Sequence, residues 1–85
     1  MKEVELILCL FPGNELTIRR LHARDETFRA VCGDLGEALR ALRYWESTGP
    51  AAEIRAKQYR ELVGELESEI ANFLKAFERS APGGG

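Results

Sequence analysis

Apolar residues recur every three or four positions from Asn14 to Glu46, and Asp25 is the one exception. This spacing is typical of an amphipathic helix whose apolar stripe follows a heptad repeat. The stripe carries Ile18, Leu21, Phe28, Cys32, Leu35, Leu39 and Leu42. The pattern therefore predicts one long helix over residues 14–46.

A second stripe with the same spacing begins after Ser47-Thr48-Gly49-Pro50. It carries Ala56, Tyr59, Val63, Leu66, Ile70, Phe73 and Phe77. Gly49 suits the end of a helix because it readily adopts a left-handed conformation, and Pro50 suits the first turn of the next, where its missing N–H has no partner anyway. We expect a turn at 47–50 and a second helix over residues 50–78.

The two stripes match each other when the chain is folded back at Gly49. Antiparallel helices then bring together residues whose numbers add to 98, and seven consecutive layers form, from Leu42 with Ala56 to Leu21 with Phe77. The sequence thus predicts an all-α fold, an antiparallel two-helix hairpin with coiled-coil-like packing over residues 14–79.

Asp25 interrupts the first stripe, where a buried carboxylate without a partner would be costly. Asp is a favoured N-cap residue, because its side chain accepts a hydrogen bond from a backbone N–H in the first turn. We therefore expect the long helix to break near residues 24–26.

Apolar residues beside the stripes widen both faces beyond what two helices need. They are Val31, Ala38, Trp45, Leu62 and Leu74. A lone hairpin would order about sixty residues at a cost of roughly 1 kcal/mol or more each while burying one stripe per helix. Because symmetric homodimers are the commonest closed assembly, we expect two hairpins to dock as a four-helix bundle. Val31, Trp45, Leu62 and Leu74 are the candidate contacts, although Trp45 also suits packing within its own chain.

Residues 1–13 are a separate apolar segment, in which Val4, Leu6, Leu8 and Leu10 share one face of an extended chain. This alternation is compatible with a β-strand. A single strand leaves its backbone groups unpaired, so the segment must pair with a second subunit, join a partner's sheet edge or become helical. We expect a dimer contact or docking segment, with Leu6, Leu8 and Leu10 as candidate contacts.

Composition supports the helical prediction and narrows the class of partner. Ala, Glu, Lys, Leu and Arg make up just over half of the 85 residues, as in long helices. The net charge is −2 and Glu is interleaved with the Arg clusters, which argues against the basic face that nucleic acid requires. The apolar run Val4 to Phe11 is far shorter than the roughly 20 residues that span a bilayer. We expect protein partners, first a second copy, with no nucleic acid, no membrane span and a cytoplasmic location.

The sequence offers little catalytic or metal-binding chemistry. Cys9 and Cys32 form no CxxC or Cys/His group, which favours two buried apolar thiols in a reducing compartment over a disulfide. His22 has no second His or Cys one turn away. Because a catalyst needs convergent groups in a concavity, we expect no enzymatic activity, no cofactor and no bound metal.

Several short motifs between residues 11 and 75 occur together. They are Phe11-Pro12, Ile18-Arg19-Arg20-Leu21, Phe28, and Glu67-Ser68-Glu69-Ile70 before Leu74. In these motifs the chain resembles the YdcH-like family of short bacterial proteins. The resemblance implies an uncharacterised helical hairpin and supplies no catalytic residue. The segment before Phe11, the Gly tail and the few basic residues early in the second helix depart from the family's pattern.

The tail at 80–85 lacks an apolar anchor, so we expect it to be flexible. Gly83-Gly84-Gly85 resembles the Gly-Gly ends of sulfur carriers and protein modifiers, although sulfur carriers are β-grasp domains and this chain has room for at most one strand. The main expectation is a self-associating, non-enzymatic interaction module. The alternative is a carrier or modifier conjugated through its Gly tail, and a third hypothesis is a peripheral membrane or heavy-metal binder that uses Val4 to Phe11 and Cys9.

Overall fold

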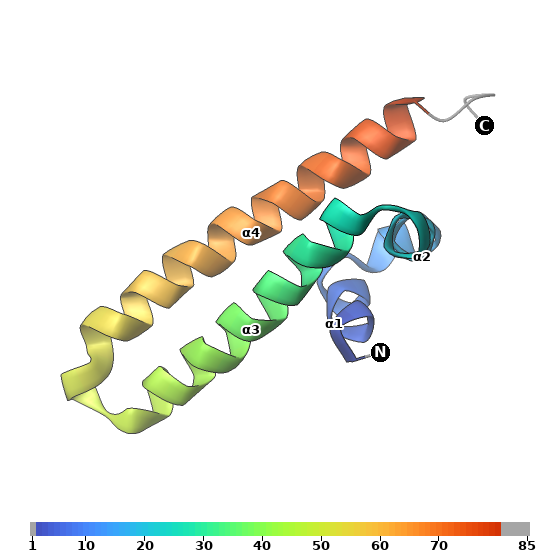
Figure 1. Cartoon of the computed structure of the whole chain (residues 1–85). Coiled ribbons are helices and arrows are strands. Elements are labelled where there is room, and N and C mark those ends of the chain that lie inside the picture. Colours follow the sequence, from blue (N-terminus) through green and yellow to red (C-terminus); the bar gives the residue numbers. More distant parts are fainter. Residues whose placement is uncertain (1, 81–85) are drawn as a thin grey trace.

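The computed structural model describes residues 2–80, and every regular element within them is a helix (Figure 1). The elements are α1 (Lys2–Leu10), the 3₁₀ turn η1 (Pro12–Asn14), α2 (Glu15–Arg24), α3 (Glu26–Thr48), the 3₁₀ turn η2 (Pro50–Ala52) and α4 (Glu53–Ser80). The predicted all-α class is confirmed for these residues. They form four α-helices, where the sequence predicted a two-helix hairpin with a break near residues 24–26 in its first helix.

α3 and α4 are the two long helices, and they lie side by side in opposite directions (Figure 1). Each buries its apolar stripe against the other: Phe28, Leu35 and Ile70 are fully buried. The rings of Phe28 and Phe73 pack edge to face with their centroids 5.5 Å apart. Contacts between these two helices therefore form the main part of the core.

α2 and α3 meet at Asp25, whose backbone is extended (φ −116°, ψ 108°). The Oδ1 atom of Asp25 accepts a hydrogen bond of 3.0 Å from the Phe28 N–H, which makes Asp25 the N-cap of α3. The guanidinium of Arg29 also donates to the His22 carbonyl oxygen at 2.8 Å. The chain turns sharply here, and Figure 1 shows α2 nearly end-on while α3 runs across the view. The break thus lies where the sequence placed it.

The turn between α3 and α4 is made by Gly49, which has φ 121° and ψ −180°. The positive φ agrees with the sequence analysis, but the backbone is extended, whereas we expected a left-handed helical residue. This region is essentially restricted to glycine. The Ala52 N–H donates to the Gly49 carbonyl oxygen at 3.0 Å, so η2 starts directly from the turn.

Residues Lys2–Leu10 form the helix α1, so of the alternatives left open for the segment 1–13 the helix is confirmed for these residues and the strand is wrong. The alternating apolar residues contain a helical spacing as well. The side that packs on the core carries Val4, Ile7, Leu8 and Phe11. Ile7 is fully buried while Leu10, on the other side, is 38 % exposed. A helix pairs its backbone groups internally, so the segment needs no second strand.

α1 and α2 cover one side of the α3–α4 pair, because α1 packs against α2 and α3 while α2 contacts α3 and α4. The Asn14 Nδ2 donates to the Glu78 Oε2 at 2.7 Å and so holds the start of α2 beside the end of α4. Leu74, one turn before Glu78, is 3 % exposed. The half of the pair nearest the turn extends beyond this cover (Figure 1).

Candidate functional site

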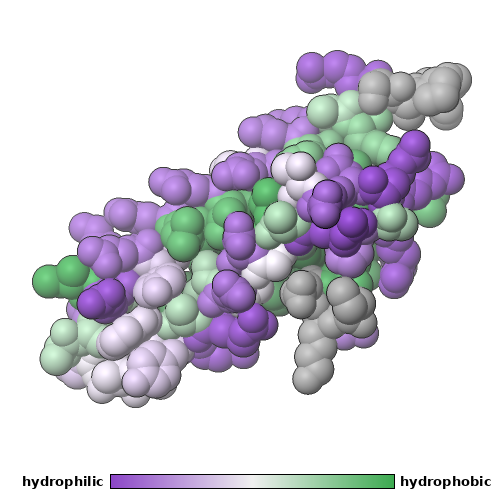
Figure 2. Space-filling model, in the orientation of Figure 1, coloured by the Kyte–Doolittle hydropathy of each residue, from purple (hydrophilic) through white to green (hydrophobic). Residues whose placement is uncertain are grey.

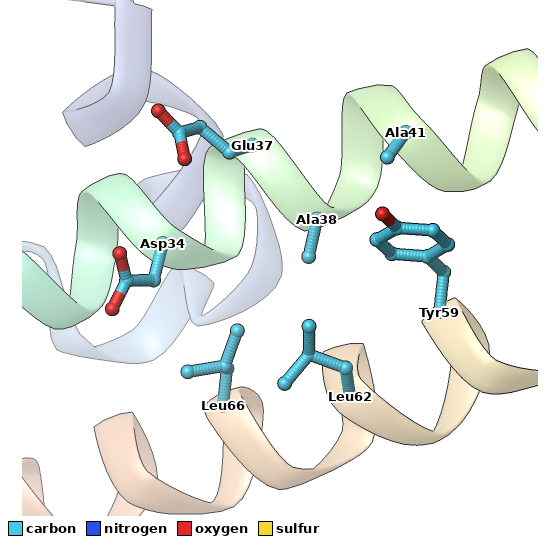
Figure 3. Close-up of a pocket in the computed structure, with 7 residues that line it drawn as sticks. All are labelled: Asp34, Glu37, Ala38, Ala41, Tyr59, Leu62 and Leu66. Atoms are coloured by element: carbon cyan, nitrogen blue, oxygen red, sulfur yellow. The ribbon is translucent and has the colours of Figure 1, made fainter.

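A groove lies between α3 and α4 at the middle of the pair and encloses about 410 Å³ (Figure 3). Its lining consists of Asp34, Glu37, Ala38 and Ala41 from α3, and Tyr59, Leu62 and Leu66 from α4. Helical periodicity puts Leu62 on the opposite flank of the α4 stripe from Leu74, the residue beside α2. The groove therefore opens on the side of the pair that α1 and α2 leave uncovered, and the ribbons of α1 and α2 lie behind it in Figure 3.

The floor of the groove is apolar. Ala38 and Leu66 are buried, whereas Leu62 is 40 % exposed at the opening. Figure 3 shows Ala38 and Leu62 reaching toward each other from the two helices. Because alanine is small, the α3 wall leaves a hollow opposite the leucines. In the face that Figure 2 shows, hydrophobic surface follows the line where α3 and α4 meet and recurs at the turn end.

The open side continues along α4 into a second hollow of about 310 Å³. It is lined by Glu69, Asn72, Phe73 and Ala76. Leu62, Glu69 and Ala76 are seven residues apart, so they share one stripe of the helix. The two hollows therefore form one continuous strip of accessible surface along this flank of α4.

Trp45 lies at the turn end of the same strip. The guanidinium carbon of Arg55 lies 5.4 Å from the Trp45 ring centroid, a cation–π arrangement. The exposed Tyr44 ring packs edge to face on Trp45 at 5.0 Å. Both the packing and the anchor interpretation of Trp45 are compatible with this arrangement, because Trp45 is half-buried.

Acidic residues predominate along the open side. Asp34, Glu37, Glu65 and Glu69 are all exposed, and Arg55 is the basic residue placed among them. Arg60 belongs to the other flank, where it donates to Glu53 at 3.1 Å and to Glu46 at 3.4 Å. These hydrogen bonds, first the one to Glu53, raise the pKa of Arg60 above its usual value. Arg60 therefore remains charged and ties the start of α4 to the end of α3.

The structure brings all the predicted hairpin-core residues to the interior or its edge. Nine are buried: Ile18, Leu21, Phe28, Cys32, Leu35, Ala56, Val63, Leu66 and Ile70. Five are partly buried: Leu39, Leu42, Tyr59, Phe73 and Phe77. Leu21 and Phe77, a predicted layer, line one hollow together with Asp25 and Phe73, the next layer.

The predicted partner contacts divide into three groups. Leu10 and Leu62 are exposed, and Leu6, Leu8 and Trp45 are half-buried. Val31 and Leu74 are buried, so assigning them to a partner was wrong. Leu74 is covered within the chain because α2 lies beside it, and Val31 belongs to the core cluster.

Sequence reasoning missed two features of the surface and core. Ile7 is a fully buried core residue, and its spacing of three from Val4 and four from Phe11 was the available signal. Leu16 and Ile54 are two further large apolar residues that are exposed, at 60 % and 76 %. Neither has an apolar neighbour one turn away in the stripe, and the sequence alone gave no reason to single them out.

Among residues 2–80 no group of three or more His, Cys, Asp or Glu side chains could hold a metal ion. Within the same residues no helix has the length and apolarity needed to cross a membrane. Cys9 is exposed, contrary to the expectation that it is buried, and Cys32 is buried. α4 extends to Ser80, and the alternative that rests on Gly83-Gly84-Gly85 lies outside the described residues.

No family model matches the chain, and comparisons with curated proteins and with solved structures find no match either. The resemblance to the YdcH-like family stays a prediction.

Proposed function

We propose that this protein is a non-enzymatic interaction and assembly module that self-associates, joining the α3–α4 hairpins of two copies in a four-helix bundle. The observation that carries the proposal is the open groove, which has an apolar floor and the exposed Leu62 at its mouth. α1 and α2 supply helical cover for one side of the pair. A second copy would supply comparable cover for the other.

The residues that line the groove favour the binding of another protein surface. Apart from two exposed carboxylates and one phenol, its walls are alkyl groups. Removing alkyl surface from water stabilises a contact by about 25 cal/mol for each Å² buried. An apolar groove floor of this kind, rimmed by charged residues, is typical of a protein–protein contact.

Sedimentation velocity of the full chain tests this function. We expect a dimer whose fraction rises with concentration, and we expect Leu62→Asp to shift the chain to monomer because the change places a charge in the contact. Leu16→Asp is the matched control, since Leu16 is also an exposed leucine but lies on α2. Circular dichroism should show equal helicity for both variants. A chain that stays monomeric from micromolar to millimolar concentration would contradict the proposal.

A further inference from the structure

The open side of the α3–α4 pair carries its apolar and charged residues in a symmetric order. Arg55 lies over Trp45, while Ala38 with Leu62 and Ala41 with Tyr59 line the same groove. On this side, a residue of α3 and a residue of α4 whose numbers add to 100 therefore lie opposite each other, at the same level along the pair. Ala38 and Leu62 mark one such level, near the middle of α3 and closer to the start of α4 than to its end.

On α4, the stripe around this level reads Arg55, Leu62, Glu69 at intervals of seven. The exposed leucine is at the centre, and opposite charges lie two turns away on either side. On α3, Val31, Ala38 and Trp45 are spaced in the same way. When two copies of such a stripe run antiparallel with their central leucines aligned, each positive charge faces a negative one. The stripe is therefore complementary to a second copy of itself.

We propose that a second copy docks on the groove about a two-fold axis at the level of Ala38 and Leu62, with the two turns at opposite ends of the dimer. α4 then packs antiparallel to α4 of the partner subunit, and α3 to α3. This inference rests on the proposed self-association and specifies its surface, axis and register.

Each contact that this axis generates is chemically reasonable. Leu62 meets Leu62 of the partner subunit, and Arg55 meets Glu69 of the partner subunit on both sides of the axis. On α3, the half-buried Trp45 is the residue of its stripe that remains for the partner subunit, because Val31 and Ala38 are buried within their own chain. No two like charges oppose each other along either stripe.

The other face-to-face arrangement, with both turns at the same end, pairs charges less well. It would place α3 of the partner subunit over α4. Glu65 would then lie beside Asp34 of the partner subunit, and Glu69 would face an apolar residue. Like charges at contact distance destabilise a contact and ion pairs stabilise it, so the antiparallel arrangement is favoured.

Cysteine cross-linking tests the axis directly. In a Cys9→Ser background, which removes the exposed thiol, Leu62→Cys places two thiols at the axis. Side chains that meet at such a crossing approach disulfide distances. We expect a covalent dimer that forms at least about tenfold faster than with Ser68→Cys, an exposed position on the side of α4 that faces away from α3. Equal rates for the two variants would overturn the axis.

Charge reversal tests the register. Arg55→Glu and Glu69→Arg should each weaken the dimer about tenfold, because each replaces two ion pairs by two repulsive contacts. The double variant should return to within about threefold of the wild-type dissociation constant. Additive losses in the double variant would overturn the register while the wild-type dimer still supports the proposed function. A wild-type chain that is monomeric would overturn both and leave the groove to a different protein.

Discussion

Asp25 and Gly49 show how single residues direct this chain. Asp25 ends one helix and begins the next, because its carboxylate accepts from the Phe28 N–H and its backbone is extended. Gly49 reverses the chain with a positive φ that other residues rarely adopt. Both residues act on the backbone, and their effects need no long-range contact.

Two glycine-to-alanine substitutions test whether backbone conformation or lack of space determines the cost of adding a side chain. An added Cβ would meet no atom within 4 Å at Gly49 or at Gly64. We expect Gly49→Ala to lower the free energy of unfolding by about 1–3 kcal/mol, because alanine is strained at φ 121°. Gly64→Ala, on the exposed surface of α4, should raise it by about 0.5–1 kcal/mol. Urea denaturation measures both, and equal effects would contradict the backbone explanation.

At the scale of elements, α1 is the least obvious helix and the one that most changes the picture. The sequence analysis assigned this apolar segment to a partner, but as a helix it packs on the core of its own chain. Ile7 is its main contact, fully buried in the same cluster as Ile18 and Phe28. The core on this side of the pair is therefore completed within one chain.

The contribution of α1 is measurable by truncation of its buried side chain. Ile7→Ala should lower the free energy of unfolding by about 2–5 kcal/mol, the usual cost of removing a fully buried large aliphatic group. Leu10→Ala is the control, since Leu10 is 38 % exposed and should change stability by about 0.5 kcal/mol or less. If thermal unfolding gives the two variants the same stability, α1 does not pack as described.

At the scale of the whole molecule, the α3–α4 pair is covered unevenly. α1 and α2 lie against it away from the turn, while the half nearest the turn consists of two helices alone (Figure 1). The overall extents, 53 × 22 × 21 Å, describe an elongated body. A two-helix segment buries less apolar surface per residue than a region to which three or four helices contribute, so its local stability is lower.

Amide hydrogen exchange should detect this difference. At low protein concentration, amides of residues 42–48 and 53–60 should exchange faster than those of 28–36 and 66–74, because fewer apolar contacts hold them closed. At high concentration the protection of the turn half should rise, since the proposed bundle covers it. Uniform protection at low concentration would contradict the uneven core, and unchanged protection on concentration would contradict dimerisation through this half.

The sequence by itself determined the features that depend on local chemistry and short-range periodicity. The heptad stripes located the buried residues of α3 and α4, such as Leu35 and Ile70, because a 3.6-residue period needs no knowledge of distant contacts. Asp25 and Gly49 marked the break and the turn because capping and positive φ are local properties. These inferences needed only neighbours within one or two turns.

Only the tertiary structure decided what covers the stripes. The segment 1–13 has an alternating and a helical apolar spacing at once, and its packing on the core selected the helix. Leu74 and Leu62 are both leucines on the flanks of α4, yet one is buried beside α2 and the other remains at an open groove. Burial depends on which distant element lies against a surface, and that is a property of the folded chain.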